Sequence, residues 1–106
     1  MKIGLMLVGE KGHHVLKHII PKYNVTFVTS YNDNGTDSRS YHHIKEICNK
    51  EEIHFITHER GKGTPNALND GVDLVFVVGW QYLIKGEIEK YIVFHDSYLP
   101  EFKGWA

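Results

Sequence analysis

The residues best suited to chemistry in this sequence follow an apolar segment from Ile92 to Phe94. His95 comes directly after that segment, and Ser97 and the pair Leu99-Pro100 follow within five residues. An imidazole at the end of a strand can act as a general acid or base, or donate a hydrogen bond to an oxyanion. Proline forces an extended or turned backbone at the residue before it. The spacing therefore indicates a site in a loop at a strand end. The alternative, which His95 alone would favour, is an unpaired histidine at the end of a strand.

A second candidate is the glycine-rich stretch Gly9-Glu10-Lys11-Gly12, between an apolar run and a helical pattern. A glycine-rich turn that leads into a helix can present backbone N–H groups to an anion. We therefore predict that Gly9, Lys11 and Gly12 contact a phosphate or a sugar. The stretch fits neither the dinucleotide fingerprint nor the P-loop. The alternative is a tight turn that binds nothing.

The histidines do not predict a metal site. His14 and His18 have the i, i+4 spacing that could chelate a metal, but without a clear third ligand this spacing is weak evidence for a site. His42 and His43 are neighbours on a predicted helix, so they point in different directions. His58 begins a loop after a predicted strand. We expect most of the histidines to be surface residues, and His54 and His58 to be strand-face and loop residues rather than metal ligands.

The elements that must position the candidate residues alternate between strand and helix patterns. Short apolar, β-branched runs are typical of buried parallel strands. The predicted strands are Lys2–Val8, Asn24–Ser30, Ile53–Thr57, Asp73–Gly79 and Ile92–Phe94, and the predicted helices are His13–Ile20, Arg39–Glu51, Pro65–Asn69 and Gln81–Lys90. This alternation predicts one α/β domain over residues 1–106, a Rossmann-like three-layer αβα fold with a mainly parallel, doubly wound sheet.

Composition narrows the class of protein. A chain of 106 residues with 42% apolar residues fits one small globular domain. A net charge of −1 offers no general attraction to nucleic acid or to a membrane surface, so we expect neither as a partner. Cys48 is the only cysteine, which favours a reducing compartment. The N-terminal apolar run is too short for a signal peptide or a membrane span, so we predict a cytoplasmic protein.

Two segments of the sequence resemble the folate-dependent formyltransferases. The first is D-L-V-F-V-V-G-W-Q-Y-L-I, and the second is V-F-H-D-S-Y-L-P-E-F-K-G-W-A. The motif they share with the family is His-x-Ser-x-Leu-Pro, followed by a basic residue and glycine. In this sequence the motif falls on His95, Ser97, Leu99, Pro100, Lys103 and Gly104. The predicted strand pattern also agrees with the Rossmann-like N-terminal half of that family.

The resemblance implies transfer of a formyl group from 10-formyltetrahydrofolate, the formyl donor, to a primary amine. His95 would be the catalytic acid–base group and would stabilise the oxyanion. The pterin would lie against Trp80, Gln81, Tyr82, Leu83 and Ile84, with Ser97, Leu99 and Pro100 also on the cofactor side. Gly9, Lys11, Gly12 and Lys103 would bind the acceptor. For Trp80 and Tyr82, ordinary packing at a sheet edge is the alternative.

The sequence departs from the family pattern at two places. Val93 stands where many members carry an asparagine that assists the oxyanion, and valine cannot donate a hydrogen bond. The family's catalytic aspartate lies further downstream than Ala106, the last residue. We therefore expect a truncated N-terminal part of a formyltransferase catalytic domain, poorly active alone. Its exposed sheet edge could form a homodimer.

The resemblance leaves the acceptor open. We favour the amine of a nucleotide-linked amino sugar, because the sequence has no C-terminal tRNA-binding domain. The stretch Gly9–Gly12 also differs from the phosphate loop of glycinamide ribonucleotide formyltransferases. The alternatives are a methionyl-tRNA formyltransferase-like protein, a catalytically dead nucleotide- or folate-binding module, an NAD-binding domain, and a folate hydrolase relative.

Overall fold

The computed structural model describes residues 1–32, 38–59, 71–80 and 88–94. These residues form strands β1 (Lys2–Leu7), β2 (Asn24–Ser30), β3 (His54–Thr57), β4 (Leu74–Val78) and β5 (Tyr91–Phe94), helices α1 (Gly9–Ile19) and α2 (Ser38–Lys50), and the 3-10 turn η2 (Ile88–Lys90). Each of these strands was predicted to within one residue at either end. The predicted helix Pro65–Asn69 lies outside the described residues, as does most of Gln81–Lys90.

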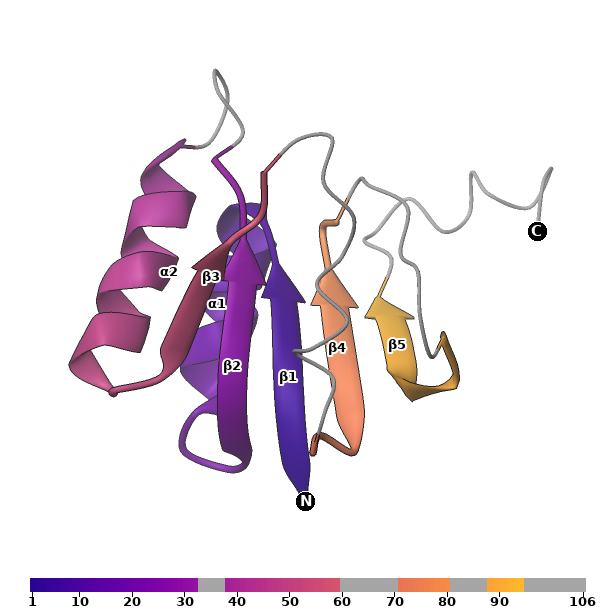
Figure 1. Ribbon diagram of the computed structural model, residues 1–106. Coiled ribbons are helices and arrows are strands. Elements are labelled where there is room, and N and C mark those ends of the chain that lie inside the picture. Colours follow the sequence, from indigo (N-terminus) through magenta and orange to yellow (C-terminus); the bar gives the residue numbers. More distant parts are fainter. Residues whose placement is uncertain (33–37, 60–70, 81–87, 95–106) are drawn as a thin grey trace, which may run out of the picture.

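The described strands form one sheet in the order β3-β2-β1-β4-β5, and every neighbouring pair is parallel. The chain steps outward from β1 to β3 and then returns to the other side of β1 for β4 (Figure 1). All strands therefore end at one edge, which we call the carboxyl edge and which is uppermost in Figure 1. The predicted α/β class with a mainly parallel sheet is confirmed.

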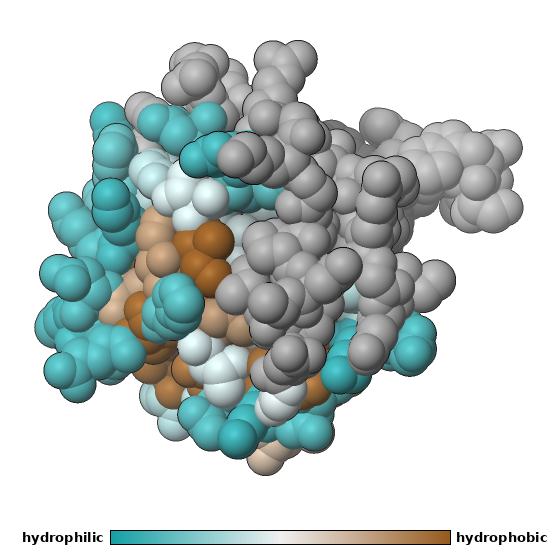
Figure 2. Space-filling model, in the orientation of Figure 1, coloured by the Kyte–Doolittle hydropathy of each residue, from teal (hydrophilic) through white to brown (hydrophobic). Residues whose placement is uncertain are grey.

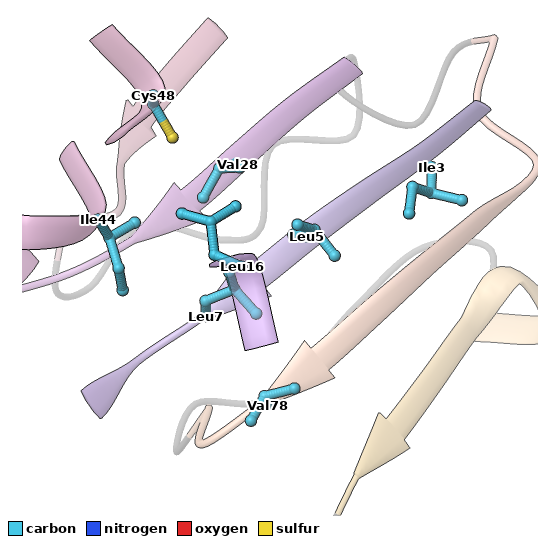
Figure 3. Close-up of a cluster of buried hydrophobic side chains, with 8 residues drawn as sticks. All are labelled: Ile3, Leu5, Leu7, Leu16, Val28, Ile44, Cys48 and Val78. Atoms are coloured by element: carbon cyan, nitrogen blue, oxygen red, sulfur yellow. The ribbon is translucent and has the colours of Figure 1, made fainter. Parts of the chain in front are cut away.

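Helices α1 and α2 pack on one face of the sheet, because two successive steps in one direction with right-handed crossovers place both helices on the same side. The side chains between them form the main core. That core contains Ile3, Leu5, Leu7, Leu16, Val28, Ile44, Cys48 and Val78 (Figure 3). Ile44 and Cys48 lie four residues apart on one face of α2, and both are buried in this core. Each fully buried aliphatic side chain contributes about 1.5–3 kcal/mol.

The opposite face of the sheet carries a second cluster of buried side chains. It contains Met6, Phe27, Val72, Val75 and Val77. The pairing of β1 with β2 skips Thr26, whose hydroxyl donates a hydrogen bond of 3.1 Å to the carbonyl oxygen of Ile3. The skip places Phe27 opposite Gly4, so the Phe27 ring covers the bare backbone of Gly4. In Figure 2, which shows this side of the molecule, apolar residues reach the surface near the middle of the view.

The start of α1 differs from the sequence prediction. The stretch Gly9–Gly12 was predicted to be a tight turn, but it forms the first turn of the helix. Gly9 has a φ of 81°, and this left-handed conformation turns the chain from strand to helix within one residue. Gly12 is buried, and an added Cβ would lie 3.0 Å from Cβ of Leu7. Gly12 thus lets α1 pack closely on β1.

Candidate functional site at the carboxyl edge

The carboxyl edge collects the residues that directly follow the strands. Tyr31 follows β2, Trp80 comes two residues after β4, and His58 follows β3. In open parallel sheets, ligands bind outside this edge, where the strand order reverses. Here the order reverses between β1 and β4. The end of β4 is therefore the place where the fold favours a binding site.

Three aromatic rings meet at this edge and form what we call the aromatic cluster, Tyr31, His58 and Trp80. The ring centroid of Trp80 lies 5.0 Å from that of Tyr31 and 5.1 Å from that of His58. The centroids of Tyr31 and His58 are 6.1 Å apart. The rings of Tyr31 and Trp80 meet edge to face at 73°, a favoured aromatic geometry. Tyr31 and His58 are buried, at 7% exposure each, while Trp80 is partly exposed.

Backbone hydrogen bonds beyond the strand ends hold this arrangement. The amide of His58 donates to the carbonyl of Ser30 at 2.8 Å, and the amide of Val8 donates to that of Val78 at 3.0 Å. Gly79 has a φ of 76°, and a Cβ there would lie 2.5 Å from the carbonyl oxygen of Val8. Only glycine fits this approach, so Gly79 determines how the chain leaves β4 toward Trp80.

Burial lowers the pKa of His58 below its ordinary value, and the neighbouring Glu59 carboxylate partly offsets this effect. The imidazole is therefore neutral at pH 7 and can both donate and accept a hydrogen bond. Two buried hydroxyls, of Thr29 and Ser30, end β2 beside the cluster. Neither has a hydrogen-bond partner in the part of the chain that the structure describes. The edge is thus polar and aromatic, without a buried charge among these residues.

The structure describes four of the residues that the sequence predicted for the site. Gly9 and Trp80 lie at the carboxyl edge, Lys11 is exposed in the first turn of α1, and Gly12 is buried under that helix. The phosphate or sugar contact that was predicted for Gly12 would therefore involve a residue that is buried between α1 and β1. The other predicted residues lie outside the described residues: Gln81, Tyr82, Leu83, Ile84, His95, Ser97, Leu99, Pro100 and Lys103.

The pairing of β4 with β5 links the two predicted segments. Phe94, the residue before His95, pairs with Val78, and Val78 lies two residues before Trp80. The described parts of the two segments that resemble the formyltransferases thus lie on neighbouring parallel strands that end at the carboxyl edge.

The sequence reasoning missed His58 as a site residue and placed it in a loop. The signal that it shares with His95 is its position, since each is the first residue after a predicted strand. Tyr31 was not predicted as a site residue, because its ring contact with Trp80 joins two strand ends that lie far apart in the sequence.

Within the described ranges, no group of three or more potential metal ligands comes together. In the same ranges, no helix is long and apolar enough to cross a membrane. Comparison with family models, with curated proteins and with solved structures gives no match to this chain.

Proposed function

We propose that this chain is part of a folate-dependent formyltransferase, which moves a formyl group from 10-formyltetrahydrofolate to a primary amine. The observation that carries the proposal is the parallel pairing of β4 with β5. The resemblance rests on two sequence segments, which must meet at one edge of a sheet to build one site. The pairing of Val78 with Phe94 brings the described parts of both segments to the carboxyl edge.

The chemistry needs a neutral amine and a group that moves protons. The amine nitrogen attacks the formyl carbon, a C–N bond forms, and the formyl oxygen becomes an oxyanion. Collapse of this intermediate breaks the bond to N10 of the folate, the amine loses a proton, and N10 gains one. In the proposal, His95 carries this proton and donates a hydrogen bond to the oxyanion.

Trp80 supports the folate part of the proposal. Its indole is partly exposed near the strand-order reversal, and the rings of Tyr31 and His58 pack against it. A flat pterin binds well against an aromatic wall that is fixed by its own packing. Aromatic residues of the sheet edge would thus form a wall of the cofactor site.

The position of Lys11 supports a phosphate-containing acceptor. Its side chain is exposed in the first turn of α1, next to Gly9. The N-terminal end of a helix carries a partial positive charge that favours anions, and the lysine would add a full charge. A sugar nucleotide, which has phosphates and an amino sugar, is therefore the acceptor that we propose.

The test is binding of 5-formyltetrahydrofolate, a folate that does not transfer its formyl group in this reaction. Calorimetric titration should show saturable binding, and Trp80→Ala should weaken it at least tenfold. Tyr23→Ala is the matched control, because Tyr23 is an aromatic residue that is 49% exposed and precedes β2, away from the carboxyl edge. Binding of NAD with no binding of folate would favour the dinucleotide alternative and contradict the proposal.

The outer strand β5 supports a second copy of the chain as a partner. Ile92, Val93 and Phe94 are exposed to 38%, 48% and 50%, which is unusual for three successive apolar residues. Sedimentation should show a concentration-dependent dimer, and Phe94→Lys should shift it to the monomer. A chain that stays monomeric at all concentrations would refute this pairing.

A further inference from the structure

The solvent side of α1 carries two histidine rings that converge on one point. Nε2 of His14 and Nε2 of His18 are 3.1 Å apart, and the ring centroids are 4.5 Å apart. Both side chains are exposed. Two nitrogen lone pairs would repel each other at this distance, so one ring must donate its N–H to the other. The two Nε2 atoms, each of which could bind a metal, are thus already held close together by one hydrogen bond.

The separation of these two nitrogens suits a metal ion. With metal–nitrogen bonds of about 2.0–2.1 Å, an N···N distance of 3.1 Å corresponds to an angle of about 95–102° at the metal. This lies between the 90° of a tetragonal ion and the 109° of a tetrahedral one. An ion at these bond lengths lies to one side of the line between the two nitrogens, so both rings must turn from their hydrogen-bonded orientation, while the two Nε2 atoms keep their separation.

We propose that His14 and His18 form a two-histidine site for a divalent transition-metal ion, with Cu²⁺ bound more tightly than Ni²⁺ or Zn²⁺. Imidazole suits these three ions, and their affinity for nitrogen ligands follows the Irving–Williams order. No redox step is involved. The ring that donated its Nε2 hydrogen carries a hydrogen on Nδ1 instead, both Nε2 atoms bind the ion, and water completes the coordination.

Some charges near the two histidines favour a bound cation, and others oppose it. His18 lies in the last turn of α1, where the partial negative charge of the helix end favours a cation. Lys17 adjoins His18 and opposes a cation, while Glu10 lies one turn before His14 on the same helix. Glu10 is not part of a three-ligand group in the described residues. The two imidazoles therefore carry the site.

This site is separate from the proposed formyltransferase site. Helix α1 begins at the carboxyl edge and runs back along the sheet, so His18 lies toward the opposite edge. The sequence alone did not favour a metal here, since i, i+4 spacing leaves the ring orientations open. The convergence of the two Nε2 atoms is the additional observation.

The test is titration of the tag-free chain with Cu²⁺, Ni²⁺ and Zn²⁺ by calorimetry, with Mg²⁺ as the negative control. One ion should bind per chain, and His14→Ala and His18→Ala should each weaken Cu²⁺ binding at least tenfold. His54→Ala removes an exposed histidine on β3 and should leave the affinity unchanged. All three positions are exposed, so the variants should keep the circular dichroism of the parent. Unchanged Cu²⁺ affinity in His14→Ala or His18→Ala, or loss of binding in His54→Ala, would overturn the proposal.

Discussion

Gly4 and Phe27 make a contact whose energy can be measured directly. Gly4 lies in the middle of β1, and a methyl group at this position would overlap the Phe27 ring. Phe27 is 5% exposed and packs in the second buried cluster, so its ring has little room to move. The substitution Gly4→Ala should therefore destabilise the fold, although alanine is normally better than glycine in a strand.

The expected magnitude combines two opposing effects. Overpacking of a well-filled core costs about 1–3 kcal/mol. Replacing glycine with alanine stabilises the folded state by about 0.4–1 kcal/mol, because the unfolded chain loses conformational freedom. The free energy of unfolding should thus fall by up to about 2.6 kcal/mol. In a domain of this size, each kcal/mol lowers Tm by about 4–8 °C.

A double-mutant cycle separates the overlap from other effects. Urea unfolding of the parent, Gly4→Ala, Phe27→Leu and the double variant gives the coupling energy, which we expect to be about 0.5–3 kcal/mol for residues in contact. Leucine removes the ring atoms that the methyl group would meet, so Gly4→Ala should be neutral or stabilising in that background. Equal costs of Gly4→Ala in both backgrounds would refute the packing argument.

Burial raises the pKa of Cys48 to about 12 from an ordinary 9.0, so the unfolded thiol ionises first and stability should fall by about 1.4 kcal/mol per pH unit above pH 9. Chemical unfolding of the parent and Cys48→Ala between pH 8 and 10.5 checks this, and identical pH profiles would contradict it. Burial lowers the pKa of His58, so the unfolded state binds more protons below about pH 6.5 and stability should fall as the pH drops from 7.5 to 5.5. His58→Phe should flatten that profile, and an unchanged slope would argue against the assignment. Thr29→Val removes a buried hydroxyl that lacks a partner in the described residues, and should be neutral or stabilising by up to about 1 kcal/mol in thermal unfolding. A loss above 1 kcal/mol would show that this hydroxyl makes a stabilising contact.

The regular elements could be predicted because their patterns are local. The β-branched run of β2 and the apolar spacing of α2, with Ile44 and Cys48 on its inner face, each determine an element by themselves. The start of α1 could not be predicted. A glycine at a turn and a glycine that permits close packing look alike in sequence, and Gly12 is of the second kind.

The candidate site could be predicted only in part. Trp80 was predicted through the resemblance to the formyltransferases, and the strand order then shows that it lies where an open parallel sheet favours a binding site. Tyr31 and His58 were missed as members of one cluster, because their contacts with Trp80 join three separate strand ends. Contacts of this kind depend on the strand order, which sequence periodicity does not specify. The skip at Thr26, whose hydroxyl donates a hydrogen bond to the carbonyl of Ile3, is a similar case, since periodicity does not predict a register shift.

The central claim is a folate site at the carboxyl edge, and a crystal structure of the chain with 5-formyltetrahydrofolate tests it most directly. We predict that the pterin lies against Trp80, at the end of β4 and beside the end of β5. Pterin density elsewhere on the molecule, away from residues 80–84, would contradict the assignment.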